Sequence, residues 1–581
     1  MRPTSLALLC IALAASAAAQ TPVVIGAGTD EWNTRTPAAT DPTGDAAATA
    51  DLTALWVTSD DSYLYVAFEV AAPVLLNEGN GLRLVVDVDD DAATGTPVHG
   101  LGAELDWRFG QRQGTLVSGG TTRNVYAGQV GLWTAPQVTS TRFEVALPRQ
   151  PGLGERAVLT GDRVRLAVLG GTGDVIPAET GGLVVDLSSA PHPRAAVDLG
   201  KQDVGHVRLM AYNVLRDRLT GATYEAAYRR VLRAIRPDVA IVVEVYDSSG
   251  PAVAARIGAL LGDPSGTWHG AKAGPDVIVA ARTDVSLVEE VRGNGLFRVA
   301  SPDGGPDWIV AALHPPCCTN DTGRQAELDA LVAAVRRLRA NGTIPADAPF
   351  VVGGDMNFVG DARQLVTLLN GDIADEATYG PDAPFDLDGS ALDAAAPLAT
   401  GVPAAFTWRN ATSSYPAGQL DYVAYSDAVL ASGNAFVLYT PGLTAEERTA
   451  YGLQRDDTAG LDEAASSGPF ASDHLPVVVD LYARPIVAVE STPGGAVEIV
   501  SVAPNPVRQS TTVRVQTGQA GRVEVALVDA LGRRVRSAEA VASGPGEIVV
   551  PLDAVGLAAG VYVVRVTTPG GSASRRVVVA R

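Results

Sequence analysis

The chain has 581 residues, a formal net charge of −21 and a hydrophobic content of 46%. A chain of this length exceeds what a single hydrophobic core can organise, so we expect about three domains. The hydrophobic content, together with abundant Gly and Pro, is typical of a loop-rich β or α/β protein and excludes a largely disordered chain. The acidity disfavours a protein that coats nucleic acid, although it leaves room for a local basic cleft.

Residues 1–19 predict a secretory signal peptide. Arg2 supplies the charged start, residues 6–15 form the apolar core, and residues 17–19 are three alanines that suit cleavage before Gln20. Cys10 follows Leu9 inside the apolar core, where a lipoprotein signal would need a small residue, so we expect no lipid anchor. No later apolar run is long enough to span a bilayer, so we expect an exported protein without a transmembrane segment.

Residues 21–198 predict an all-β sandwich, because short alternating runs such as 64–68 and 82–87 are separated by turn signals. The acidic run 87–91 follows one of these strands. Its carboxylates could collect calcium, but a solvated acidic turn is slightly favoured. Residues 188–193, rich in Ser and Pro, are expected to form the linker to the next domain.

Residues 205–482 predict an α/β domain, because strand and helix patterns alternate along them. Gly353 and Gly354 stop one apolar run and predict a tight turn there. The expected strands are 207–212, 239–243, 308–313, 349–352, 420–423 and 475–481, and the expected helices end before Pro237 and span 324–339. Residues 483–498 are expected to be a linker, and residues 499–581 a small all-β sandwich with alternating strands at 523–529 and 560–566.

Polar residues that could take part in catalysis or metal binding stand at the ends of the central strands. Each alone is more often a turn or capping group, but strand ends on one side of a sheet converge in space. Several carboxylates without cysteine ligands suit a hard divalent cation, for which we expect Mg²⁺, with Mn²⁺ and Ca²⁺ as alternatives. Such an ion beside histidines suits phosphoester hydrolysis. The residues are Asn213, Glu244, His314, Asp355, Asn357, Asp421, Asp473 and His474.

In their order along the chain, six short motifs resemble those of the endonuclease/exonuclease/phosphatase superfamily. That group includes deoxyribonucleases, abasic-site endonucleases, neutral sphingomyelinases and inositol-polyphosphate phosphatases. The resemblance covers residues 205–482 and implies a four-layered α/β/β/α sandwich with a site at one edge of two packed sheets. The motifs are Met210–Asn213, Val243–Val245, Leu313–His314, Gly354–Asn357, Leu420–Tyr422 and Ser472–Pro476.

The resemblance implies a metal site and a water site. Glu244 would hold the metal ion, assisted by Asn213 and Asp473. Asp355 would orient or deprotonate the attacking water, and Asn357 would position that water and the phosphate. Val243 stands where many members have Gln, a departure that removes no ligand.

Histidines have the remaining implied roles. His474 would contact the scissile phosphate, with Asp421 fixing its tautomer, and His314 would be a general acid for the leaving oxygen. The partner of His314 stays open, because the glutamate found in the deoxyribonucleases has no clear equivalent and Asp276 is only nearby in the pattern. With Asn357 and His474, Arg324 is expected to bind the substrate.

Two adjacent cysteines, Cys317 and Cys318, follow His314. In a secreted protein they could form a vicinal disulfide or remain two buried thiols, and neither alternative is favoured. They are the only cysteines after the signal peptide, so a cysteine-based zinc site is excluded.

Both flanking regions resemble known modules. The N-terminal region is similar to sugar- or haem-binding sandwiches of the DOMON and family-nine carbohydrate-binding type, through residues 55–56, 64–66 and the acidic strand end. The C-terminal region resembles the type A sorting domain of the type nine secretion system, with a generic carbohydrate-binding sandwich as the alternative. Its motifs are residues 503–506, 528–535 and 560–565.

Taken together, these patterns predict a secreted or cell-surface, divalent-metal-dependent phosphoesterase. We expect a nuclease-like phosphodiesterase, with a sphingomyelinase- or phospholipase C-like enzyme or a phosphatase as the alternative. A non-catalytic binding protein on the same fold is less favoured, because the motif residues are intact. The expected partners are a phosphodiester substrate (nucleic acid or phospholipid head group) and the type nine secretion machinery, and we expect a monomer.

Overall fold

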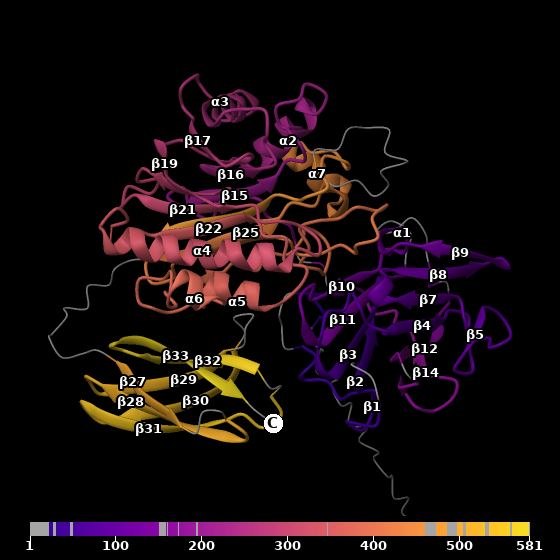
Figure 1. Cartoon of the computed structure of the whole chain (residues 1–581). Coiled ribbons are helices and arrows are strands. Elements are labelled where there is room, and N and C mark those ends of the chain that lie inside the picture. The colour runs from indigo at the N-terminus through magenta and orange to yellow at the C-terminus, as the bar shows by residue number, and fades with distance from the viewer. Residues whose placement is uncertain are drawn as a thin grey trace, which may run out of the picture.

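The computed structural model shows a strand-rich molecule in which a larger central region lies above an N-terminal and a C-terminal body of strands in the view of Figure 1. The predicted signal peptide, most of the 483–498 linker, and the 504–506 and 529–533 parts of the C-terminal motifs lie outside the described residues. The structure describes residues 22–26, 31–46, 50–149, 158–159, 161–171, 173–192, 194, 196–345, 347–458, 472–484, 497–503, 507–528, 534–557 and 560–579.

Two antiparallel sheets make up the N-terminal region, and their inner faces enclose one hydrophobic core. The five-stranded sheet has the order β1 (Ala39–Thr40), β2 (Leu52–Ser59), β3 (Tyr63–Val74), β11 (Ser140–Pro148), β10 (Trp133–Ala135). The other sheet has the order β13 (Val175–Ile176), β12 (Arg163–Leu169), β4 (Arg83–Asp87), β7 (Leu105–Arg108), β8 (Gln113–Ser118), β9 (Thr121–Val125), with β14 (Leu183–Asp186) also on β12. Outside these sheets lie β5 (Thr96–Val98), β6 (Leu101–Ala103) and α1 (Ala127–Val130).

Two mixed six-stranded sheets form the central region and pack face to face. Along the strands, residues alternate between the face shared by the sheets and the outer face, which fixes the register of both. The first sheet is β17 (His269–Ala273), β18 (Val277–Ala281), β16 (Val239–Val243), β15 (Val207–Asn213), β26 (Val477–Ala483), β25 (Leu430–Val437). The second is β19 (Val285–Val291), β20 (Asn294–Val299), β21 (Trp308–Leu313), β22 (Phe350–Asp355), β24 (Asp421–Tyr425), β23 (Asp393–Ala394).

Helices cover the outer faces of both central sheets. In β15, Leu209 and Ala211 face the second sheet, whereas Met210 and Tyr212 pack under the first helical layer. That layer is α2 (Glu225–Ile235) and α3 (Gly250–Leu261), with α7 (Ala445–Tyr451) beside it, and the opposite layer is α4 (Asp321–Ala340), α5 (Arg363–Asn370) and α6 (Glu376–Tyr379). Among the described helices, none is long and apolar enough to cross a membrane.

The predicted tight turn at Gly353 and Gly354 is wrong, because β22 runs through both glycines to Asp355. The glycines serve close packing between strands. A Cβ on Gly354, whose φ is +132°, would lie 2.1 Å from the carbonyl oxygen of Leu313 on the neighbouring β21. A side chain here would push β21 away from β22, so the glycine holds the two strand ends together.

The C-terminal region consists of two small antiparallel sheets around their own core. It contacts the central region through Arg565, which donates to Asp427 over 3.1 Å, and through Ser572, which donates to Asp388 over 3.2 Å. One sheet is β27 (Glu498–Ala503), β28 (Ser510–Thr517), β31 (Gly546–Asp553), and the other is β30 (Arg534–Ala542), β29 (Gly521–Val528), β32 (Gly560–Thr568), β33 (Gly571–Val579).

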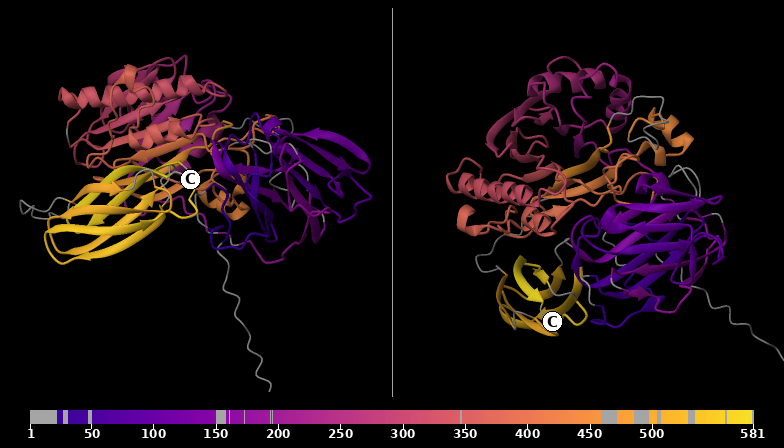
Figure 2. Two further views of the ribbon diagram at one scale, coloured as in Figure 1. Left: turned by 60° about the horizontal axis from the view of Figure 1, so that its bottom comes forward. Right: turned by 45° about the vertical axis from the view of Figure 1, so that its right-hand side comes forward.

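The N-terminal sandwich and the central region share a hydrophobic core, and the two bodies lie side by side in all views (Figures 1 and 2). Trp133 of β10 is only 4% exposed, and its ring centroid lies 5.3 Å from that of Tyr63 and 5.6 Å from that of Phe406 in the central region. Ile25 also forms a backbone bridge to Ala404. This apolar contact fixes the sandwich against the central region.

We expect Trp133→Ala to lower the free energy of unfolding by about 3–5 kcal/mol, because it leaves a cavity in this shared core. Urea unfolding, followed by far-ultraviolet circular dichroism of the backbone, measures the change in the free energy of unfolding. Tyr126→Ala is the control: its side chain is 36% exposed, and we expect a change within about 0.5 kcal/mol. Equal small effects of both substitutions would mean that the two bodies do not depend on this contact.

Candidate active site

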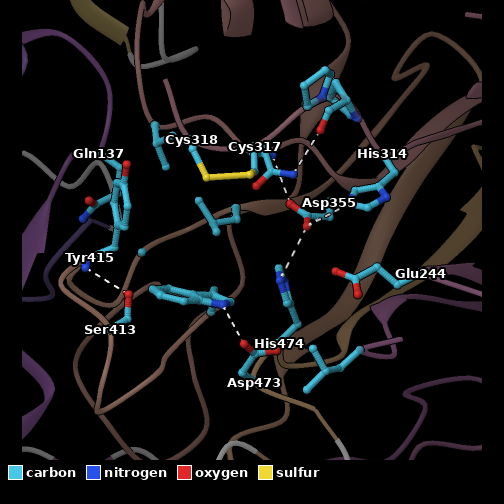
Figure 3. Close-up of a pocket in the computed structure, with 18 of the residues that line it drawn as sticks. Gln137, Glu244, His314, Cys317, Cys318, Asp355, Ser413, Tyr415, Asp473 and His474 are labelled. Carbon is cyan, nitrogen blue, oxygen red and sulfur yellow. Dashed lines mark hydrogen bonds and ion pairs between the residues drawn. A yellow bond between two sulfur atoms is a disulfide. The ribbon is translucent and has the colours of Figure 1, made fainter. Parts of the chain in front are cut away.

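The buried carboxylate of Asp355 lies at the centre of the site residues that were predicted from the sequence (Figure 3). Asp355 ends β22 and is 1% exposed. Its Oδ2 accepts a hydrogen bond from Asn213 Nδ2 over 3.0 Å, and it lies 3.7 Å from His314 Nε2 and 3.5 Å from His474 Nε2. Asn213 and His474 come from the first central sheet and its edge, whereas Asp355 and His314 come from the second.

On one side of Asp355, His474 is held by a second buried aspartate. Its Nδ1 lies 2.9 Å from Asp421 Oδ2, and both residues are buried. The backbone N–H of Asp421 donates to Thr407 Oγ1 over 2.8 Å, which fixes the start of β24. The Asp421 contact leaves Nε2 as the imidazole nitrogen that faces Asp355 and the pocket.

Opposite it, His314 repeats the arrangement with Asp276. The distance from His314 Nδ1 to Asp276 Oδ2 is 2.5 Å, so Asp276 is the partner that the sequence left open. Asp276 stands directly before β18 and also accepts the backbone N–H of Glu244 over 3.2 Å. Asn294 Oδ1 accepts the backbone N–H of His314 over 2.7 Å. Asp276 stands directly before the apolar run of β18, and this position was the signal in the sequence that could have identified it.

Both imidazoles are poised to carry positive charge. Burial by itself would lower the pKa of His474, but the carboxylates of Asp421, Asp355 and Asp473 outweigh it and raise the pKa to about 10. Burial likewise opposes the charge on His314, whereas its bond to Asp276 and the charge of Asp355 raise its pKa to about 9. Two cationic donors facing one small volume suit an anionic group such as a phosphate.

Glu244 and Asp473 place further carboxylate oxygens at the same edge. Glu244 follows β16 with a φ of +63°, and its carboxylate accepts from Asn213 Nδ2 over 2.9 Å and from the backbone N–H of Arg216 over 3.0 Å. Asp473 Oδ2 accepts from Trp408 Nε1 over 3.2 Å, whereas its buried Oδ1 has no hydrogen-bond partner within the described part of the chain. A buried carboxylate oxygen without a donor, in a set of oxygen ligands, fits a hard divalent cation.

Asn357 lies just beyond the strand, in a left-handed conformation with a φ of +52°. Its backbone N–H donates to Asp355 Oδ1 over 3.0 Å, which is the hydrogen bond of an Asx turn. The side-chain Nδ2 donates to the carbonyl oxygen of Pro315 over 3.0 Å. Asn357 therefore ties the loop after His314 to the Asp355 carboxylate and also lines the pocket.

Arg324 does not reach the substrate pocket, so its predicted role in substrate binding is wrong. The side chain is 0% exposed, because it lies beneath the loop that follows His314. Its guanidinium donates to Gln364 Oε1 and to the carbonyl oxygens of Pro316 and Cys318, each over 2.9 Å, and to Asp321 over 2.6 Å. With its donors occupied by the protein, Arg324 supports the pocket wall from behind.

That wall carries the disulfide between Cys317 and Cys318, one of the two alternatives that the sequence left open. Cys318 adopts a left-handed φ of +65°, and its carbonyl oxygen is one of those held by Arg324. Both cysteines line the pocket beside Pro315 and Pro316. The loop therefore presents a stiff, largely apolar surface toward the site.

The pocket has a volume of about 500 Å³, and part of its wall could not be foreseen from the sequence. Gln137 belongs to the N-terminal sandwich, yet it lines the pocket and donates to the carbonyl oxygen of Ala417 over 3.3 Å. Across the interface, the guanidinium of Arg112 stacks on the Tyr415 ring at 4.3 Å from its centroid. Gln137 and Tyr415 face each other at one side of the pocket in Figure 3. Because these residues are brought together by domain packing, no local pattern marks them.

Two protein-family models match the sequence. Residues 210–474 match the model described as Endonuclease/Exonuclease/phosphatase family, and residues 501–580 match the Secretion system C-terminal sorting domain. The chain contains an endonuclease/exonuclease/phosphatase domain. The family supports a hydrolase that acts on phosphoester bonds, and the sorting domain indicates a secreted or cell-surface protein. No curated protein matches the chain.

The solved structures to which this chain is similar are distant in sequence. The human Nocturnin catalytic domain is 17% identical, with 48% of this chain and 95% of that chain covered and a TM-score of 0.29. Sphingomyelinase C from Streptomyces griseocarneus is 16% identical, with 47% and 99% covered and a TM-score of 0.27. A mannosyl-6-phosphatase from Bacteroides thetaiotaomicron is 13% identical, with 48% and 99% covered and a TM-score of 0.29.

We expect Asp421→Asn to lower turnover by up to about 10⁴-fold with little change in fold, because His474 would lose the carboxylate that sets its tautomer and stabilises its charge. Steady-state kinetics and circular dichroism measure the two effects. Asp386→Asn is a matched control. Asp386 is 3% exposed and outside the pocket, and burial and its contact with Asp427 raise its pKa to about 7. Turnover of the Asp421 variant within about threefold of wild type would make Asp421 a purely structural residue.

Proposed function

We propose that the protein is a divalent-cation-dependent hydrolase of phosphodiesters. The observation that carries this proposal is the Asp355 carboxylate between His314 and His474, each imidazole backed by its own aspartate. A carboxylate flanked by two cationic donors combines a group that accepts a proton from water with groups that bind and protonate an anionic ester. A binding protein without catalysis would not need both imidazoles anchored in this way.

Glu244 and Asp473, with Asn213 beside them, are the residues that would hold the cation. When bound, a divalent cation neutralises negative charge on the phosphate and lowers the cost of building the transition state. The protein contributes half-buried carboxylates whose contacts hold them in place, including the buried Asp473 oxygen without a hydrogen bond among the described residues. Trp408 holds the other oxygen of Asp473 and thereby sets the direction of its carboxylate.

Around the phosphate, each of these residues has a different proposed role. Asp355 orients the attacking water and takes its proton, and Asn357 holds the loop that borders this water. His474 donates from Nε2 to a non-bridging phosphate oxygen, while Asp421 keeps its other nitrogen protonated. His314, held by Asp276, donates a proton to the leaving oxygen.

The pocket wall supports a substrate that presents one phosphate at a time. Arg216 is the single arginine among the described residues that line it, and no lysine lines it. The remaining wall is largely apolar or aromatic, from Leu215 and Tyr246 to Trp408 and Tyr415. Duplex nucleic acid needs several cations along its backbone. We therefore propose a nuclease-like action confined to short or single strands, with phospholipid head groups as the second candidate because of the apolar wall.

The C-terminal sorting domain supports a secreted or cell-surface location for the proposed activity. We propose that the signal peptide directs the chain across the inner membrane and that the type nine secretion machinery then recognises residues 499–581. Arg565 and Ser572 dock the sorting domain on the central domain through Asp427 and Asp388, which do not line the pocket. This position leaves the pocket open while the sorting domain is attached.

Hydrolysis should stop in excess chelator and return with added Mg²⁺, because the proposed cation ligands, Glu244, Asp473 and Asn213, all offer oxygen atoms. Glu244→Gln should lose orders of magnitude in rate and need a higher cation concentration for half-maximal activity. Colorimetric assays of a phosphodiester across a cation titration measure both. Glu290→Gln, an exposed glutamate outside the pocket, is the control. Full activity of wild type in excess chelator would exclude the metal-dependent reaction.

Salt dependence separates the two substrate candidates on a panel of DNA, RNA, sphingomyelin and inositol phosphates. For a single-stranded nucleic acid, log KM should rise with log salt with a slope of about 0.7 per phosphate contacted, and Arg216→Ala should reduce that slope. For a zwitterionic head group, the slope should be close to zero. Turnover of sphingomyelin without cleavage of DNA or RNA at any salt concentration would reject the nuclease-like action in favour of the lipid.

A further inference from the structure

Three carboxylates gather at one end of the N-terminal sandwich, and none of them lines the active-site pocket. Asp41 follows β1, Asp45 lies in the loop after it, and Asp174 stands directly before β13. One oxygen from each of the three lies within 4.8 Å of the others. The loop that carries Asp41 and Asp45 belongs to the five-stranded sheet, whereas Asp174 belongs to the opposite sheet.

A fourth carboxylate, that of Asp51, points into the same loop and is incompletely satisfied. Its Oδ2 accepts the backbone N–H of Gly44, between Asp41 and Asp45, over 2.7 Å. Its Oδ1 is buried and has no hydrogen-bond partner among the residues that the structure describes, and the residue is only 8% exposed. A buried carboxylate oxygen without a donor or a counter-charge is costly, so this atom indicates a missing positive partner.

The surroundings of the four carboxylates are uniformly acidic. Burial, followed by the charges of Asp45, Asp174 and Asp51, raises the pKa of Asp41 to about 6. Burial also raises the pKa of Asp174, although the backbone N–H of Leu52 donates to its Oδ2 over 2.7 Å. Within the described residues, no arginine, lysine or histidine forms an ion pair with any of the four.

The acidic run that the sequence singled out, residues 87–91, has no buried carboxylate oxygen without a hydrogen bond among its described residues, unlike Asp51. Asp87 accepts the backbone N–H groups of Asp91 and Gly102, each over 3.2 Å. Thr94 Oγ1 lies 3.1 Å from each oxygen of Asp89 and 3.0 Å from Glu104 Oε1. One oxygen each of Asp87, Asp89 and Glu104 also lies within 4.8 Å of the others, so both alternatives for residues 87–91 stay open, but hydrogen bonds from backbone N–H groups and Thr94 already occupy these carboxylates.

We propose that Asp41, Asp45, Asp51 and Asp174 bind a calcium ion that fastens the segment after β1 to Asp174 on the opposite sheet. Calcium accepts six to eight oxygen ligands in irregular geometry, which suits carboxylates from three separate segments, whereas Mg²⁺ demands a near-ideal octahedron. The ion joins the edges of the two sheets that enclose the sandwich core. Its role is structural, and it is distinct from the catalytic cation at Glu244.

Calcium titration of the full-length protein tests this site, with Mg²⁺ kept in excess throughout so that the catalytic position stays saturated. Isothermal titration calorimetry should show one Ca²⁺ bound per chain. Thermal unfolding should shift upward by about 5 °C at a hundredfold excess over the Kd, because the ion binds only the folded sandwich. Absence of Ca²⁺ binding to the wild type, or binding without any thermal shift, would overturn the proposal.

Two variants each remove one proposed calcium ligand, one at an exposed residue and one at a buried residue. Asp45→Asn changes an exposed carboxylate, so the chain should fold normally and bind Ca²⁺ at least tenfold more weakly. Asp51→Asn should abolish the calcium-dependent shift and leave the Mg²⁺-dependent activity unchanged. Asp89→Asn, in the hydrogen-bonded acidic turn, is the matched control and should retain full calcium binding. Loss of binding in Asp89→Asn with retention in Asp45→Asn and Asp51→Asn would assign the ion to residues 87–104 and reject the proposed site.

Discussion

The burial of the Asp355 carboxylate between two sheets is the constraint on which the active site depends. A buried carboxylate is tolerated only where donors or cations surround it, and here an amide and two imidazoles supply them. Those groups arrive from both central sheets, so the sheets must pack in one register for the site to exist. Gly354 allows β21 and β22 to end close enough together for His314 and Asp355 to meet.

A second layer of contacts fixes the direction of each candidate catalytic side chain. Asp421 and Asp276 bind the far nitrogens of the two histidines, so both Nε2 atoms face the same carboxylate. Trp408 likewise fixes the direction of the Asp473 carboxylate, because its indole N–H donates to one of the two oxygens. These partners decide protonation and orientation, because the group that occupies one nitrogen of an imidazole determines what the other can do.

Beyond the shared chemistry, the pocket is shaped by parts of the chain that have no catalytic motif. The disulfide loop, supported by Arg324, forms one wall, and the stacked pair of Arg112 and Tyr415 stiffens another. The N-terminal sandwich therefore contacts the central region directly, through Trp133 and Gln137, and is not joined to it by a linker alone. We infer that substrate choice depends on this interface.

Much of the fold was predictable because its causes are local. Apolar runs identified the strands that become β15, β16, β21 and β26, and the structure brings several of the polar residues at their ends together around Asp355. Arg324 was misjudged for a physical reason: an arginine at the start of an amphipathic helix is usually solvated, and only the loop that folds over it turns it into a buried support. The turn predicted at Gly353 failed because two glycines also permit close strand packing.

The sequence by itself determined which polar residues end the central strands, the endonuclease/exonuclease/phosphatase domain, and the sorting domain at the C-terminus, since each follows from short motifs in a fixed order. Only the tertiary structure decided that Asp276 is the partner of His314, that Gln137 reaches the pocket, and that Asp51 joins Asp41, Asp45 and Asp174. These pairings connect residues separated by up to 280 positions along the chain. Their proximity follows from how sheets and domains pack, and packing depends on the sum of many buried contacts rather than on any local pattern.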